Sequence, residues 1–163
     1  MRRDIVTLRS CGTRVVFLAA WLAFSIHNTG LSTQHSALAF EDLGNLSANQ
    51  FDSESSSNPF GKGSPFAPNG INNPFSPYGS PFSNTSATNR FATEAPRLYD
   101  QQGNYRGKLS ANPYDQDSTS NQFGRYGSPY SPDSLNNQYG AGSPFRPDSP
   151  NNPYGRGWKI EGR

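Results

Sequence analysis

The sequence contains few of the residues on which catalysis and stable cores usually depend. Beyond residue 39 it has no cysteine, histidine, valine or methionine. Without cysteine, this segment cannot form the disulfides that stabilise many small exported domains. Without histidine and cysteine, it cannot use Ser-His-Asp or Cys-His catalysis, and most zinc sites are excluded too. We therefore predict that the chain is not an enzyme and that it binds no metal or other cofactor.

Large aliphatic side chains are also scarce in residues 40–163. The segment instead has eighteen aromatic residues, all 14 prolines and most of the 16 glycines. So little aliphatic surface predicts no conventional globular core. The expected fold class is a mostly irregular or disordered, turn-rich repeat chain. The large aliphatic residues are Leu43, Leu46, Ile71, Leu98, Leu109, Leu135 and Ile160.

The first 39 residues have the three parts of a signal peptide. Four arginines precede an apolar run at residues 15–26, and Ala37-Leu38-Ala39 fits the small-x-small pattern before a cleavage site. The run is shorter than the roughly 20 apolar residues that a membrane-spanning helix needs. We expect cleavage after Ala39, an exported protein in the periplasm or outside the cell, and no membrane span after cleavage. An earlier cut or an uncleaved anchor stays open.

The charge balance argues against a nucleic-acid partner. Four of the 14 basic residues and one of the 12 acidic residues lie in the leader, so residues 40–163 carry a net charge near −1. Their arginines and lysines are scattered singly, whereas nucleic acids require a clear basic patch. No nucleic-acid binding is expected.

A repeat of 15 or 16 residues follows a polar lead-in. The clean units share Asn-Pro/Gln-aromatic, then glycine and Ser-Pro-aromatic, which Pro-Asp/Asn follows in three of the four. Tyr78 and Tyr126 are extra residues in the 16-residue units. Asparagine followed by proline, with glycine at the fourth position, favours type I turns. Proline every few residues excludes helices and central strands. The clean units are residues 58–72, 73–88, 121–136 and 137–151.

One segment without proline breaks this pattern. Residues 98–109 place apolar residues on both sides of a glycine-containing turn, which predicts a single β-hairpin. The expected organisation is a signal peptide at 1–39, a Ser-rich lead-in at 40–57, a disordered repeat block at 58–96, the hairpin with a second repeat block at 97–160, and a tail at 161–163.

The second repeat block resembles a family of uncharacterised exported bacterial proteins that carry Asn-Pro-Tyr-Gly and Ser-Pro-Asp-Ser repeats. The matching stretches are residues 98–109, 112–118 and 124–155, about half of the segment beyond the leader. The resemblance implies a bacterial source and an envelope or extracellular location, but no activity. Gln122 and Gln138 replace the usual proline, which should loosen two turns.

Two acidic residues, Asp115 and Asp117, form a close carboxylate pair beyond the lead-in. Their spacing is similar to the start of a calcium loop, but Ser120 and Tyr126 replace the glycine and glutamate that such a loop needs. A solvated turn is the better interpretation.

The regularly placed aromatic residues are the candidate interaction site. Linked weak contacts can together bind a repetitive partner, so the sequence favours an exported structural or interaction protein. Its expected partners are cell-envelope or matrix polymers, or other copies of itself. Two alternatives stay open: a spacer whose rings pack locally, and a small folded binding module formed by residues 97–160. The candidate rings are Phe60, Phe66, Phe75, Phe82, Phe123, Tyr130, Tyr139, Phe145 and Tyr154.

Overall fold

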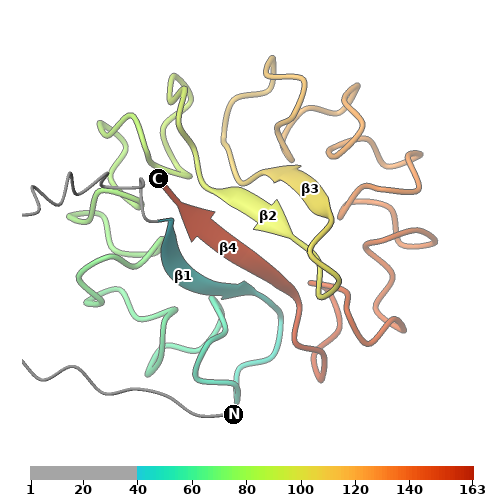
Figure 1. Ribbon diagram of the computed structural model, residues 1–163, viewed down its shortest axis with the longest axis horizontal. Helices are drawn as coiled ribbons and strands as arrows, with labels where there is room; N and C mark the ends of the chain where they lie inside the picture. Colours follow the sequence, from blue (N-terminus) through green and yellow to red (C-terminus); the bar gives the residue numbers. More distant parts are fainter. Residues whose placement is uncertain (1–39) are drawn as a thin grey trace, which may run out of the picture. The chain divides into compact units, whose positions relative to one another are not determined.

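The computed structural model describes residues 40–163, so the predicted signal peptide lies outside the described residues. Within the described segment there is no helix, and hence none that could cross a membrane. Four strands form one antiparallel sheet in the order β1-β4-β2-β3 (Figure 1). The strands are β1 (Glu41–Leu46), β2 (Arg97–Tyr99), β3 (Tyr105–Lys108) and β4 (Trp158–Gly162).

The predicted hairpin is confirmed as β2 and β3. Its turn is held by the carboxylate of Asp100, which accepts the backbone N–H groups of Gln102 and Asn104 at 3.0 and 2.8 Å. The sheet is larger than the sequence predicted, because β4 pairs with β2 and β1 pairs with β4. Strand β1 has no β-branched residue, and Gly44 interrupts it with a φ of +88°, so its sequence has no regular strand pattern.

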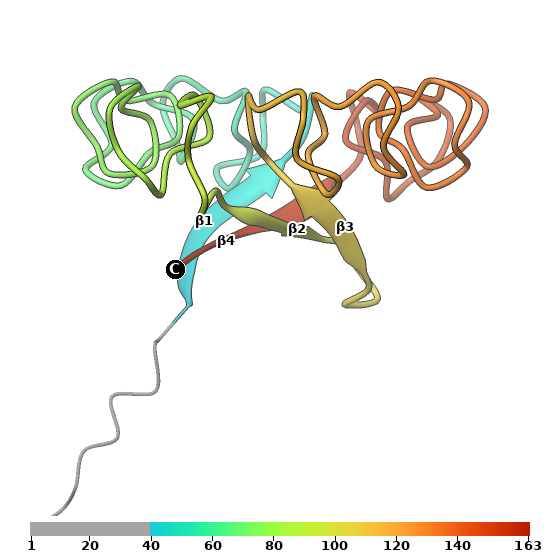
Figure 2. The same ribbon diagram turned by 90° about the horizontal axis from the view of Figure 1, so that it is seen from above.

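Between the strands the chain turns once every three residues. The first residue of each triplet donates its backbone N–H to the carbonyl three residues earlier, as in the series Ser55, Asn58, Gly61 and Ser64 at 3.0 to 3.3 Å. Proline usually occupies the second position, where its missing N–H leaves this series intact. We call residues 47–96 the first coil and residues 109–157 the second coil. Both lie over the same face of the sheet, one toward each flank (Figures 1 and 2).

The coils correct the prediction of a mostly irregular, disordered chain. Their interior is filled by serine, which the argument from missing aliphatic residues did not consider. Ser55 and Ser118, for example, are fully buried, and their hydroxyls donate to the carbonyls of Ser47 and Ser110 at 2.9 and 3.0 Å. Among the described residues, no buried side-chain nitrogen or oxygen lacks a hydrogen-bond partner. A polar interior with every group paired avoids the penalty of burying unsatisfied polar atoms.

A small apolar core lies where the sheet meets the coils. Leu43, Leu98, Trp158 and Ile160 point from β1, β2 and β4 and are at most 3% exposed. Ile71 from the first coil belongs to the same buried cluster. The few large aliphatic residues of the described segment are therefore concentrated where the sheet supports the coils.

The described segment consists of two halves with the same plan. Leu-Ser-Ala-Asn occurs at Leu46, where β1 passes into the first coil, and recurs 63 residues later at Leu109, at the start of the second coil. The glycines Gly44 and Gly107 show the same offset and have φ values of +88° and +95°. Strand β1 of the first half pairs with β4 of the second, and β3 of the second pairs with β2 of the first. Each outer pair of strands therefore joins the two halves.

Candidate binding surface

The triplet turns hold the aromatic residues at fixed positions. In the Asn-x-aromatic turns, the asparagine Oδ1 accepts the backbone N–H of the aromatic residue, at 2.9 Å for Asn58 with Phe60 and for Asn137 with Tyr139. The Nδ2 of Asn58 donates to the carbonyl of Asp52 at 3.0 Å. One side chain thus fixes both the turn that carries the ring and the preceding part of the coil.

The Ser-Pro-aromatic turns use a shorter version of the same device. The hydroxyls of Ser64 and Ser128 accept the backbone N–H groups of Phe66 and Tyr130 at 3.2 and 3.3 Å. In both kinds of turn the ring follows two residues after the capping side chain. The local sequence therefore determines where each ring leaves the backbone.

All nine rings proposed from the sequence are on the surface, and three more join them. These twelve side chains are each 87 to 98% exposed. The exposed rings missed by the sequence analysis are Phe51, Phe91 and Tyr114. Each of them follows an asparagine by two residues, and Phe51 lies in the segment interpreted as a lead-in. The Asn-x-aromatic wording could therefore have identified all three.

The two inserted tyrosines behave differently from these rings. Tyr78 is 5% exposed and donates its hydroxyl to the carbonyl of Arg163 at 3.1 Å. Burial is the main reason why the pKa of Tyr78 is raised above its ordinary value. Tyr126 packs edge-on against Tyr105, with ring centroids 5.5 Å apart. The inserted residues therefore attach the coils to the sheet and do not belong to the exposed set.

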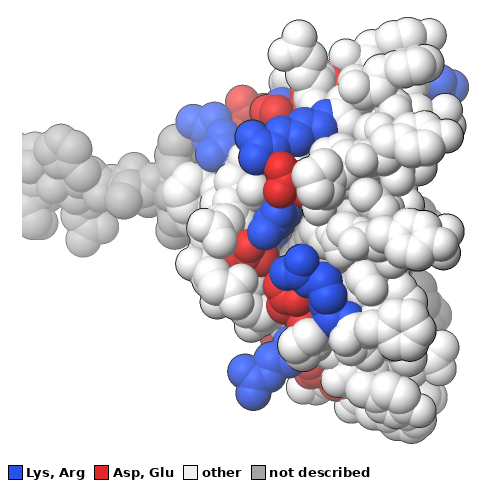
Figure 3. Space-filling model, turned by 90° about the vertical axis from the view of Figure 1, so that its right-hand side faces the viewer, with Lys and Arg blue, Asp and Glu red and all other residues white. Residues whose placement is uncertain are grey.

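Charged residues are separated from much of the coil surface. Figure 3 shows acidic and basic side chains gathered in a band, with large uncharged areas beside it. On the outer face of the sheet, an open groove of about 970 Å³ is lined by charged residues that include Asp42, Glu54 and Arg156. Lys159 and Glu161, also in this groove, pair with each other at 2.8 Å. The exposed rings do not line it.

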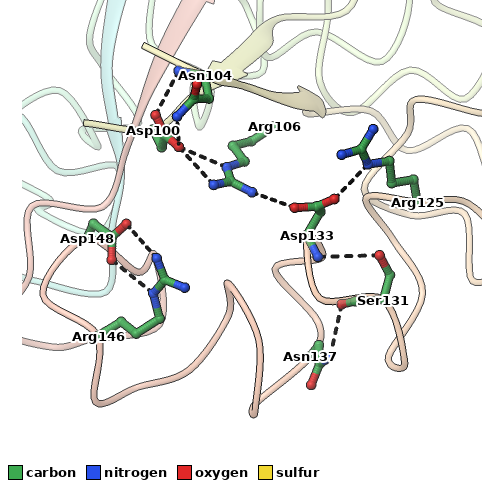
Figure 4. Close-up of polar contacts among 9 residues, drawn as sticks. All are labelled: Asp100, Asn104, Arg106, Arg125, Ser131, Asp133, Asn137, Arg146 and Asp148. Carbon is green, nitrogen blue, oxygen red and sulfur yellow. Dashed lines mark hydrogen bonds and ion pairs between the residues drawn. The ribbon is translucent and has the colours of Figure 1, made fainter. Parts of the chain in front are cut away.

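An ionic network joins the hairpin to the second coil (Figure 4). Arg106 contacts Asp100 and Asp133 at 2.9 Å each, and Arg125 contacts the other oxygen of Asp133 at 2.7 Å. Burial alone would raise the pKa of Asp100, but hydrogen bonds from Asn104 and Arg106 outweigh it and the pKa is lowered. The hydrogen bond from Arg125 is the main reason why the pKa of Asp133 is lowered.

The carboxylate pair noted in the sequence also has structural partners. Asp115 pairs with Lys108 at 2.9 Å, and its other oxygen accepts the backbone N–H of Asp117 at 3.0 Å. Within residues 40–163, no group of three or more acidic, histidine or cysteine side chains is placed to hold a metal ion.

A smaller groove lies between the two coils. It has a volume of about 510 Å³ and is lined by residues of both, with Leu46, Ile71 and Leu109 as its large apolar side chains. Serine, threonine and asparagine make up most of the remaining lining.

Comparisons with protein families, with curated proteins and with solved structures give no match. The geometry of the described residues therefore carries the functional argument.

Proposed function

We propose that this chain is an exported interaction protein that binds a polysaccharide of the cell envelope or extracellular matrix through its exposed rings. The observation that carries the proposal is the exposure of twelve aromatic side chains on turns that their neighbours hold rigidly. A typical soluble protein exposes an apolar patch of only a few hundred Å² at most. Twelve exposed rings therefore mark a surface that contacts a partner.

A polysaccharide fits these rings because its repeating sugars present apolar C–H faces at regular intervals. A flat ring can stack on such a face, and tyrosine can also form a hydrogen bond with a sugar hydroxyl. Each contact is weak, but linked contacts on one polymer add through effective concentration. The net charge near −1 beyond the leader disfavours nucleic acid as the polymer.

The rings of the second coil suit this role better than those of the first. Four of its six exposed rings carry a hydroxyl, whereas all six in the first coil are phenylalanine. We name the second set the Tyr-rich rim, and it consists of Tyr114, Phe123, Tyr130, Tyr139, Phe145 and Tyr154.

A separate module of residues 97–160 is a weaker candidate. Strand β4 extends to Gly162 and lies between β1 and β2. A fragment lacking β1 would leave one edge of β4 without its partner and would remove Leu43 from the buried cluster. The two coils and the sheet therefore support binding better as one unit.

The proposal is tested by retention of the full chain on insoluble polysaccharides, including peptidoglycan and exopolysaccharide. Rings of the Tyr-rich rim are changed to leucine two, four and then six at a time, which keeps hydrophobicity and removes the flat face. A graded loss of retention is expected. Matched Tyr→Phe changes at Tyr130 and Tyr139 measure the part played by the hydroxyls.

Two results would contradict the proposal. Unchanged retention after loss of all six rings would favour the spacer interpretation. Abrupt loss after the first pair, together with a changed far-ultraviolet circular dichroism spectrum, would mean that the rings support the fold.

A further inference from the structure

The first coil carries a ring set with a different chemistry from the Tyr-rich rim. All of its exposed aromatic residues are phenylalanines, and each is 87 to 97% exposed. We name this set the Phe rim, and it consists of Phe51, Phe60, Phe66, Phe75, Phe82 and Phe91. We infer that the Phe rim is an interface through which two copies of this chain associate.

The rings of the Phe rim can supply much of the area that a dimer needs. They occupy two positions of each 15- or 16-residue unit. A buried aromatic side chain removes about 150 to 250 Å² from water, and a standard protein interface buries about 800 Å² per partner. A contact that uses four or more of these rings therefore reaches the size of a standard interface.

The chemistry of the Phe rim favours a dry, protein-like partner. Phenylalanine has no polar atom in its side chain, so burying it against a second copy leaves no hydrogen bond unmade. The residue directly before each ring is proline or glutamine in five of the six turns. In the sixth turn it is Arg90, the one charged residue at this position. Few charges and many aromatic rings are characteristic of the buried centre of an interface.

The Tyr-rich rim is less suited to the same use. Its four tyrosine hydroxyls would each need a partner if they were buried in a dry interface. In contact with sugars and water they can remain hydrogen-bonded. The two rims therefore differ in the kind of partner that each can accept, although their backbones follow the same plan.

The arrangement of the coils makes the two contacts compatible. The first and second coils lie over the same face of the sheet, one toward each flank, so their outer ends point away from each other (Figures 1 and 2). Two copies that meet through their first coils leave both second coils accessible. A symmetric interface of this kind closes at two copies. The dimer then offers two Tyr-rich rims to one polymer, which increases avidity.

The turns also reduce the entropic cost of association. Asn73 accepts the backbone N–H of Phe75 at 2.9 Å and donates to the carbonyl of Ala67 at 2.8 Å. Asn89 makes the equivalent contacts with Phe91 and Ser83 at 2.9 Å each. Because the backbone that carries each ring is held in the free chain, less freedom is lost on binding.

The experiment is sedimentation velocity of the full chain over a range of concentrations, without any polysaccharide. The first variant combines Phe60→Asn, Phe75→Asn and Phe82→Asn. Its matched control combines Phe123→Asn, Tyr139→Asn and Phe145→Asn at equivalent turns of the second coil. Asparagine already occupies this turn position at Asn69. All proteins carry the same residues 1–39, so any association through that segment is common to them.

The unaltered chain and the matched control should sediment at twice the mass of the 17.8 kDa chain. The Phe-rim variant should have a dimer dissociation constant at least about 100-fold higher. Far-ultraviolet circular dichroism should be the same for all three, because the changed side chains are exposed and the backbone fold is expected to be unchanged.

Three results would overturn the inference. These are a monomeric unaltered chain, undiminished association of the Phe-rim variant, and equal weakening by both sets of substitutions. A monomer that binds polysaccharide through its Phe rim would replace the dimer with a second polymer site. Since the dimer is measured without polymer, failure of polysaccharide binding would leave this result intact.

Discussion

The two halves of the described segment attach their coils to the sheet by different chemistry. Position 43 of the first half corresponds to position 106 of the second, through the offset of 63 residues that relates Leu46 to Leu109. Leu43 is 3% exposed and belongs to the apolar core. Arg106 instead pairs with Asp100 and Asp133 and lies 5.8 Å from the centre of the Trp158 ring.

This difference shows how little the backbone plan depends on one kind of core. The same turn series and the same buried serines occur in both halves, with Ser55 matched by Ser118. The two halves differ in how the coil is attached to the sheet. They also differ in their exposed rings, which are all phenylalanine in the first coil and mostly tyrosine in the second. The two halves thus share one backbone arrangement, whereas the side chains that join each coil to the sheet differ between them.

The largest effect is expected from Arg106→Leu, which makes the second half resemble the first at this position. The carboxylate of Asp100 is fully buried, and it would lose its cation while remaining in place. Leaving a buried charge without its partner should lower the free energy of unfolding by about 3 to 5 kcal/mol. Chemical denaturation followed by circular dichroism measures the change.

Arg125→Leu is the matched control for this substitution. Arg125 also pairs with Asp133, but its side chain is 68% exposed. An ion pair this exposed to water is strongly screened, so its loss should change the free energy of unfolding far less than the loss of Arg106. Equal losses from the two variants would show that the buried pair does not anchor the second coil.

The next effect is expected from Leu43→Ala in the first half. The substitution leaves a cavity in the core beside Leu98 and Ile160, and such changes cost about 2 to 5 kcal/mol. The same denaturation experiment measures it. A loss below about 1 kcal/mol would mean that the first coil does not depend on the apolar contact.

The sequence predicted the hairpin and nine of the exposed rings because both depend on neighbouring residues. Asp100 caps its own turn, and Asn58 determines where Phe60 leaves the backbone. The sheet could not be predicted in the same way. Strands β1 and β4 are far apart in the chain, and their pairing depends on how the coils bring them together.

The ordered coils were missed for a different physical reason. The sequence argument counted apolar area. The interior of the coils is instead filled by serines such as Ser55, Ser86 and Ser149, which are fully buried and whose hydroxyls form hydrogen bonds with nearby backbone groups. A buried hydroxyl is tolerated only when it has a hydrogen-bond partner, and the amino-acid composition does not show whether such partners are in reach. The exposed position of Phe51 was missed because Asn49 lay in a segment with no recognised period.

Acid should destabilise the protein through the ionic network around Arg106, by a smaller amount than loss of Arg106 itself. The pKa values of Asp100 and Asp133 are lowered below the ordinary 3.8. Both carboxylates therefore stabilise the folded state above about pH 4, and this contribution is lost as the pH falls through their lowered pKa values. Thermal unfolding between about pH 6 and pH 2 measures the loss. In Arg106→Leu the acid dependence should be weaker, and an unchanged profile would contradict the role of this pair.

The smallest effects are expected from the contacts that the two halves share. Ser55→Ala and Ser118→Ala each remove a buried hydroxyl that donates to the carbonyl of Ser47 or Ser110. That carbonyl keeps a second donor, because Ser57 and Ser120 each contact it at 2.6 Å. Each hydroxyl also accepts a backbone N–H, that of Ser57 or Ser120, at 3.1 and 3.0 Å. The loss should therefore be about 1 to 2 kcal/mol, the net contribution of two hydrogen bonds, and it should be equal in the two halves.

The equality is the informative part of this last measurement. The serines have matched burial and matched distances, so their substitutions test the shared backbone arrangement without touching the attachments that distinguish Leu43 from Arg106. Denaturation of both variants in parallel gives the comparison. A difference above about 0.5 kcal/mol, beyond the usual scatter for independent sites, would show that the attachment to the sheet alters the coil itself.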